Sequence, residues 1–264
     1  VFSEFCDLET LIANAYWALE DEKEERFLDA WLFVSLYHDY GYFVSAKEYG
    51  GFKNLTDIPI EKSIFRSGVK SRYSRKLYSA YYRDRWEKNK GTGEIGDHGI
   101  LGGIVLYDAM KEEDYCPINN IFLEDFCYRI MEHNIWKMNE SYPPKHPYYR
   151  IGLDGYKKIG LQESLLFLLS LVDTIELTKK YSKFHGHSEG KLSTVQIAKN
   201  MICNVSREKI ELDVRPLAKL LEERNDDFPL KDWEDDVIGL KEWVNVFVGI
   251  ESPHKIVITH GGTK

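Results

Sequence analysis

Residues 27–37 read FLDAWLFVSLY, and the pair His38-Asp39 follows them directly. The length and apolar content of this stretch predict a helix that is buried on most sides. Gly41 lies two residues beyond Asp39 and is a plausible helix terminator, so we expect the pair where a core helix opens into a loop. Neighbouring helical residues point roughly 100° apart, so His38 and Asp39 can share one ion only if other helices supply further ligands.

Three residues further along the chain are candidates for those ligands. His98 opens the segment 97–106, in which several glycines allow close approach between helices, and Asp97 is expected to cap the helix or to orient a ligand. His133 lies at the far end of the mixed apolar helical pattern 126–134. Asp173 interrupts the apolar run 165–172, where a lone carboxylate must be paired, bound to a metal or placed at a helix edge.

Imidazole and carboxylate groups gathered from several helices are a common way to hold one or two hydrolytic metal ions. A lone His-Asp pair is more often a helix cap or a surface feature. His98 and His133 have the alternative role of buried imidazoles that donate to backbone carbonyls. The ligand types also leave redox chemistry at a di-iron site open.

The order and context of these residues resemble the HD-domain superfamily of metal-dependent phosphohydrolases, over roughly residues 1–182. In that family a His precedes a His-Asp pair, often two further His follow, and a final Asp completes the pattern. The resemblance implies a mainly α, HD-domain-like helical bundle that binds one or two divalent ions. It implies iron, manganese, nickel or zinc, with magnesium left open, and the His-rich set favours a transition metal. The metal ligands implied are His38, Asp39, His98, His133 and Asp173, with Asp39 and His98 also catalytic.

The sequence differs from the family pattern in two ways. No His occurs between Val1 and Tyr37, so the chain begins after the first ligand, a carboxylate such as Glu4 or Asp7 replaces it, or the site has lost it. Tyr42 stands where many members place a Lys. The alternative function is therefore a degenerate HD domain that serves as a nucleotide-sensing or protein-interaction module.

The segment 62–90 is locally basic and rich in Tyr, within a chain of formal net charge −8. Arg binds phosphate through two parallel donors, and aromatic rings stack on bases, so this segment is a candidate nucleotide pocket. The residues expected to bind substrate are Arg72, Arg75 and Lys76. The alternative is a solvated helix whose basic face points outward and whose Tyr side chains pack inward.

The expected activity is phosphoester hydrolysis by metal-activated water, in a phosphomonoesterase or phosphodiesterase acting on a nucleotide or related small phosphoester. The ions would lower the pKa of a bound water, and basic residues would offset charge on the phosphoryl oxygens. The acidic balance argues against an extended nucleic-acid surface. No membrane-spanning run or signal peptide is seen, so cytoplasm is the default location, and a homo-oligomer is left open.

At 264 residues and 43% hydrophobic content, the chain is long enough for one helical domain and an appendage. We expect a metal-binding helical domain over 1–182 and a small α+β appendage over 183–264. Residues 183–190 are expected to be a flexible connection, so His185 and His187 are not favoured as metal ligands, and His146 is expected to be an ordinary loop residue. The appendage is predicted to contain strands over 209–214 and 254–259, and helices over 216–224 and 233–248.

Overall fold

In a computed structural model of the protein, the residues described are 23–43, 78, 81–82, 85, 97–110, 120–133, 135, 158–185 and 191–261. They belong to two compact units, one within residues 15–156 and the other within residues 157–264. The described residues are mainly helical and include a small C-terminal antiparallel sheet, which confirms the coarse fold prediction. None of the described helices is both long enough and apolar enough to cross a bilayer.

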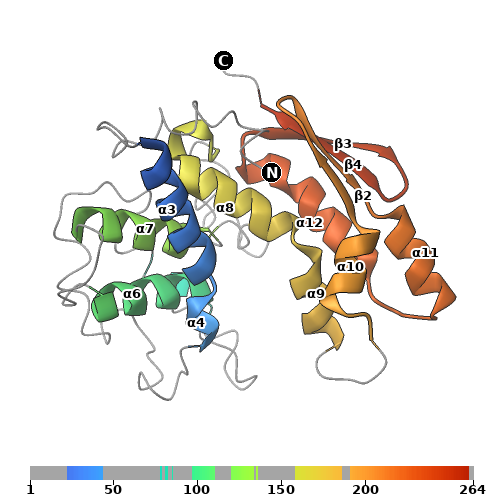
Figure 1. Ribbon diagram of the computed structural model, residues 1–264, viewed down its shortest axis with the longest axis horizontal. Helices are drawn as coiled ribbons and strands as arrows, with labels where there is room; N and C mark the ends of the chain where they lie inside the picture. The colour runs from blue at the N-terminus through green and yellow to red at the C-terminus, as the bar shows by residue number, and fades with distance from the viewer. Residues whose placement is uncertain are drawn as a thin grey trace, which may run out of the picture. The chain divides into compact units, whose positions relative to one another are not determined.

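The first unit contains four described helices: α3 (Lys23–Tyr37), α4 (Tyr40–Phe43), α6 (His98–Met110) and α7 (Asn120–Glu132) (Figure 1). The predicted helix over 27–37 lies within α3. The prediction that Gly41 terminates this helix is wrong, because α3 ends at Tyr37, His38 and Asp39 form a turn, and Gly41 lies inside α4. Gly41 is needed for close approach instead, since a Cβ there would collide with the backbone carbonyl of His98 on α6.

The prediction that α3 is buried on most sides is also wrong. Leu28, Leu32 and Leu36 are 46%, 56% and 66% exposed, whereas Phe27, Phe33 and Val34 are buried. The three leucines recur every four residues and so form one stripe on the helix surface. Apolar content alone does not tell which face of a helix is covered.

Helices α6 and α7 approach each other closely through glycine. A Cβ at Gly99 would lie 2.8 Å from the carbonyl oxygen of Ile130, and one at Gly103 would lie 2.6 Å from that of Cys127. These two glycines stand one turn apart, so they present a continuous small face to α7. The expectation that the small residues of this segment allow close helix approach is confirmed.

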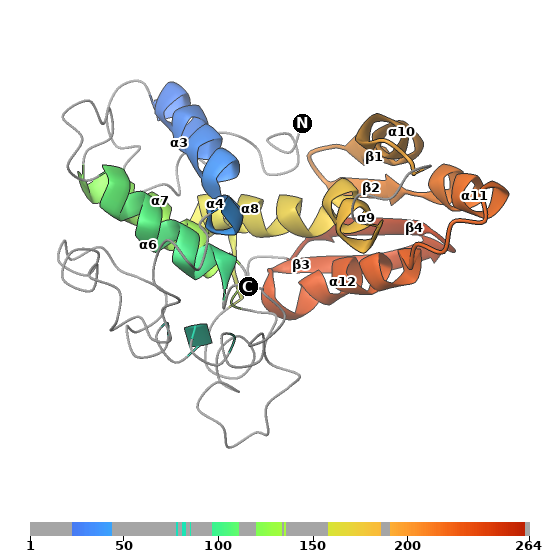
Figure 2. The ribbon, with the colours of Figure 1, turned by 90° about the horizontal axis from the view of Figure 1, so that it is seen from below.

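The second unit contains helices and a four-stranded sheet (Figure 2). The sheet is antiparallel throughout, with strand order β1-β2-β4-β3, and α12 packs against it through β3. Trp233 of α12 is fully buried, and its indole N–H donates to the carbonyl of Ile175, 3.1 Å away. The elements are a short 3-10 helix η4 (Leu161–Glu163), α8 (Ser164–Ile175), α9 (Leu177–His185), α10 (Thr194–Asn200), β1 (Ile202–Val205), β2 (Lys209–Asp213), α11 (Arg215–Glu223), α12 (Leu230–Trp243), β3 (Val246–Ser252) and β4 (Lys255–His260).

The predicted strands over 209–214 and 254–259 are confirmed by β2 and β4, whose inward residues alternate as a half-buried strand requires. The helix predicted over 216–224 is confirmed by α11. The helix predicted over 233–248 is partly wrong, because α12 ends at Trp243 and β3 begins at Val246.

Strands β1 and β3 were not predicted. The flexible connection predicted over 183–190 is wrong at its start, because α9 continues to His185. The prediction that one domain ends at residue 182 and another begins at residue 183 stays a prediction.

Candidate metal centre

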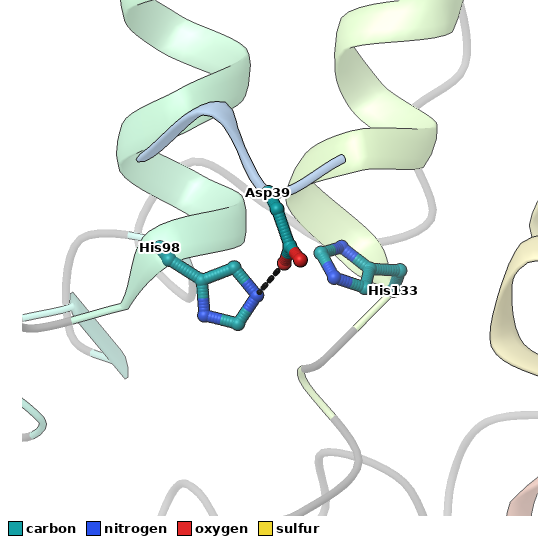
Figure 3. A group of neighbouring side chains, drawn as sticks. All are labelled: Asp39, His98 and His133. Atoms are coloured by element: carbon teal, nitrogen blue, oxygen red, sulfur yellow. Dashed lines mark ion pairs between the residues drawn. The ribbon is translucent and has the colours of Figure 1, made fainter. Parts of the chain in front are cut away.

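Three segments of the first unit bring His and Asp side chains together (Figure 3). Asp39 lies in the turn after α3, His98 is the first residue of α6, and His133 directly follows α7. One potential ligand atom from each of the three lies within 4.8 Å of the other two. Asp39 Oδ1 lies 3.2 Å from His98 Nε2.

His38 joins this group from the same turn as Asp39. Its Nε2 lies 3.4 Å from Asp39 Oδ2, and its ring centroid lies 5.5 Å from that of His133. The rings of His98 and His133 are 5.2 Å apart. Four of the five predicted ligands therefore meet at one place in the first unit, and metal binding by them stays a prediction.

The glycine contacts of α6 explain why these residues meet. Gly41 allows the turn that carries Asp39 to lie on the backbone of His98, and Gly99 places α6 against the end of α7. A Cβ at Gly99 would also lie 3.0 Å from the ring of His133. Asp97 caps α6, since its Oδ1 accepts a hydrogen bond from the backbone N–H of Ile100 at 2.9 Å. Helix capping was one of the two roles predicted for this residue.

The ring nitrogens of two imidazoles are assigned by their hydrogen bonds. His38 Nδ1 lies 2.8 Å from the carbonyl oxygen of Ser35, and His133 Nδ1 lies 2.6 Å from that of Ile130. Because a carbonyl only accepts, each Nδ1 carries the proton and each Nε2 of the neutral ring keeps a lone pair. A buried structural His makes the same bond, and so does a metal-ligating His, whose orientation it fixes.

A polar network that the sequence reasoning missed holds the end of α7. Glu132, which immediately precedes His133, is buried and accepts a 2.5 Å hydrogen bond from the Tyr78 hydroxyl. Arg129 lies 3.3 Å from Glu132 and 2.8 Å from Asp125. The spacing of Asp125, Arg129 and Glu132 along one helix face was the available signal.

Tyr42 was singled out in the sequence as the position of an expected Lys. Its ring stacks on His98, with centroids 4.0 Å apart and planes 18° apart, and its side chain is 51% exposed. One face of the His98 imidazole is therefore covered by an aromatic ring in place of the expected cation.

Asp173 lies on α8 in the second unit. Its carboxylate forms an ion pair with Lys179 at 3.2 Å, and its side chain is 10% exposed. The sequence predicted that this carboxylate is paired, bound to a metal or placed at a helix edge, and the ion pair is the first of these. Its assignment as a metal ligand stays a prediction.

Arg72, Arg75 and Lys76 lie outside the described residues, as do Glu4, Asp7, His146 and His187. Of the Tyr-rich segment 62–90, Tyr78, Tyr81 and Tyr82 are described, and all three are buried. Burial, followed by the charge of Asp97, raises the pKa of Tyr82 above its usual range. These three Tyr thus pack inward, as the alternative interpretation of the segment expected, and Arg85 lies 5.9 Å from the ring of Tyr81.

The donor set suits a divalent transition metal, because one carboxylate and three imidazoles are ligand types that iron, manganese, nickel and zinc accept. The residues of the first unit therefore fit the implied ion in chemistry and in proximity. No family model, curated protein or solved structure matches this chain.

Proposed function

We propose that this chain is a metal-dependent phosphohydrolase of the HD-domain type that acts on a nucleotide or a related phosphoester. The observation that carries the proposal is the convergence of Asp39, His98 and His133 from three separate segments, with potential ligand atoms within 4.8 Å of one another. His38 lies beside Asp39 in the same turn. The order of these residues along the chain resembles the family pattern, apart from its first His.

The His side chains support the proposal through their protonation. His38 and His133 hold their proton on Nδ1, so Nε2 of each neutral ring has the lone pair that an ion would bind. A divalent ion held by these groups would supply Lewis acidity and a more acidic bound water. Asp173 is proposed as the fifth ligand, because the family pattern ends in an Asp.

The residues of the chain have defined tasks in the proposed hydrolysis. Water adds to phosphorus and loses a proton, the ester P–O bond breaks, and the leaving oxygen gains a proton. Asp39 orients the attacking water as a hydrogen-bond acceptor, and His98 beside it exchanges protons. Arg72, Arg75 and Lys76 are proposed to offset charge on the phosphoryl oxygens.

The runner-up is a degenerate HD domain that binds a nucleotide or a partner protein without turnover. Tyr42 favours it, because this ring covers one face of His98 where the family pattern has a Lys. Such a module would retain nucleotide binding after every metal ligand had been replaced.

A matched pair of variants tests the proposal. Asp39→Asn removes the charge of the central carboxylate, whereas Asp29→Asn makes the same change at an exposed position of α3. With manganese, iron or zinc added, the wild type and Asp29→Asn should hydrolyse p-nitrophenyl phosphate, bis-p-nitrophenyl phosphate or nucleotides, and Asp39→Asn should lose about 100-fold or more in rate. Equal rates in both variants, or an inactive wild type that still binds nucleotides, would reject the hydrolase in favour of the runner-up.

A further inference from the structure

A pocket of about 280 Å³ lies within the second unit, between α12 and the turn that joins β3 to β4. Its apolar wall is formed by Ile238 of α12 together with Ile250 and Ile256. Ile250 and Ile256 are register partners in neighbouring strands, and a bulge follows Ile250. None of these residues takes part in the candidate metal centre.

The polar end of the pocket is built around a buried carboxylate. Glu234 of α12 is only 8% exposed, and its Oε1 lies 2.7 Å from Nδ1 of His254. A carboxylate has two oxygens and several lone pairs, so Glu234 can accept a further hydrogen bond from a ligand beside the one from His254.

His254 is held in position from both its side chain and its backbone. It adopts a φ of 62°, in the left-handed region that non-glycine residues rarely occupy, and its carbonyl accepts a hydrogen bond from Val214 at 2.9 Å. Such a conformation persists only where the surroundings hold it. Nδ1 of His254 is placed to donate a hydrogen bond to Oε1 of Glu234.

Ser252 adds a second polar group to the pocket lining. Its hydroxyl oxygen is buried and has no hydrogen-bond partner among the described residues. Buried hydroxyls are nearly always paired in native proteins, so this group calls for a partner that the described chain does not supply.

The cation at the rim, Lys231, interacts electrostatically with Glu234, but its hydrogen bond goes to a different carboxylate. Lys231 lies in the first turn of α12, and its Nζ forms an ion pair with Asp235 at 2.7 Å while its side chain is 66% exposed. The pocket therefore offers a ligand a hydrogen-bond-accepting carboxylate and a hydroxyl group beside three isoleucines. A ligand that fits has a hydrogen-bond-donating, positively charged head and a short apolar body.

We propose that this pocket binds a small aliphatic amine, with its ammonium group on Glu234 and Ser252 and its carbon chain against Ile238, Ile250 and Ile256. An ammonium group donates three hydrogen bonds and neutralises the carboxylate, and the branched side chains remove the carbon chain from water. The same chemistry is carried by a free amine and by a lysine side chain of a protein partner.

Three probes of similar size and different heads test the proposal on the full chain. They are 3-methylbutylamine, 3-methylbutan-1-ol and 4-methylpentanoate, observed by saturation-transfer NMR and titration calorimetry. The amine should bind, and the alcohol and the carboxylate should bind at least tenfold more weakly. Binding of Nα-acetyl-lysine amide as well would identify a protein lysine as the source, and binding of the free amine alone would identify a small molecule.

Two variants locate the binding. Glu234→Gln should weaken amine binding at least tenfold, whereas Glu242→Gln, the same change at an exposed position of α12, should leave it unchanged. Ile238→Phe should abolish binding by filling the pocket without altering a charge, with circular dichroism and thermal denaturation verifying the fold. The proposal is overturned if no amine binds, if the carboxylate binds as well as the amine, or if both pocket variants bind as the wild type does.

Discussion

The candidate metal centre depends on how individual rings are turned. The sequence identifies His38, Asp39, His98 and His133 as ligand types in a suitable order, and the structure brings these four together. The sequence does not reveal that the Nδ1–H groups of His38 and His133 donate hydrogen bonds to the carbonyl three residues earlier. These bonds depend on the backbone conformation at each helix end. Residue type is readable from sequence, whereas ring orientation is a property of the folded backbone.

The hydroxyl of Tyr78 provides a test of the network behind His133. Tyr78→Phe keeps the ring but removes the hydrogen bond to the buried Glu132 carboxylate. We expect a loss of about 1.5–3 kcal/mol in the free energy of unfolding, because the acceptor is charged. Urea denaturation measures this loss, and Tyr37→Phe on α3 is the matched control, expected to change stability by less than about 0.5 kcal/mol. A Tyr78→Phe variant as stable as the control would show that this network does not support the end of α7.

Asp226 predicts a pH dependence in the second unit. Its burial raises the pKa, but hydrogen bonds from Tyr181 and from the backbone of Phe228, with the charge and hydrogen bond of His185, outweigh burial and hold the pKa below its usual range. The resulting stability is present above the unfolded pKa of about 3.9 and is lost as pH falls through the lower folded value. The wild type should therefore lose more stability than Asp226→Asn between about pH 4 and pH 2.

Urea denaturation at several pH values follows this difference. Asp227→Asn changes the exposed neighbouring carboxylate and should keep the profile of the wild type. Parallel profiles for the wild type and Asp226→Asn would contradict the role given to this carboxylate.

At the level of elements, periodicity predicted most helices and the two inner strands, and failed where tertiary contacts decide. Residues 244–248 were expected to continue a helix, but Val246 pairs with His260 and Val248 with Ile258, and strand pairing prevails over local continuity. The exposed leucine stripe of α3 was missed because a run that is apolar all round gives no signal for the covered face.

Three helix glycines, Gly99 and Gly103 of α6 and Gly239 of α12, are expected to differ in how well they tolerate a methyl group. Gly99→Ala should displace the end of α7 and the His133 ring, lowering both stability and metal affinity, because its Cβ meets Ile130 and His133. Gly103→Ala should cost stability, about 1–3 kcal/mol for overpacking, with a smaller effect on metal affinity. Gly239→Ala on α12 meets nothing within 4 Å and should raise helix stability by about 0.5–1 kcal/mol. Thermal denaturation and metal titration of the three variants measure this order, which equal effects would contradict.

The orientation of α3 is tested by two neighbouring substitutions. Leu32→Lys falls on the exposed stripe and should change the free energy of unfolding by less than about 0.5 kcal/mol. Phe33→Ala removes a buried ring and should cost about 3–5 kcal/mol. Comparable losses in urea denaturation would mean that the leucine stripe is covered in solution.

At the scale of the whole molecule, the five proposed metal ligands come from distant parts of the sequence. His38, Asp39, His98 and His133 belong to the first unit and Asp173 to the second. The resemblance to the family implies all five as ligands, and metal binding by them stays a prediction. Asp173→Asn should therefore lower metal affinity without unfolding either unit, and Asp236→Asn, a carboxylate of α12, is the control that should bind metal as the wild type does. Metal titration of the two variants measures this difference, and circular dichroism verifies the fold. An Asp173→Asn variant that binds metal like its control would contradict the assignment.

The central claim is that the residues around Asp39 bind a divalent metal, and the most direct test is the metal content of the purified protein after exhaustive dialysis. Inductively coupled plasma mass spectrometry should find one or two ions of iron, manganese, nickel or zinc per wild-type chain. The same measurement should find close to none in Asp39→Ala, and the wild-type value in Asp29→Ala. A wild type that stays empty when supplied with manganese, iron or zinc, or an Asp39→Ala variant that retains the wild-type content, would contradict the claim.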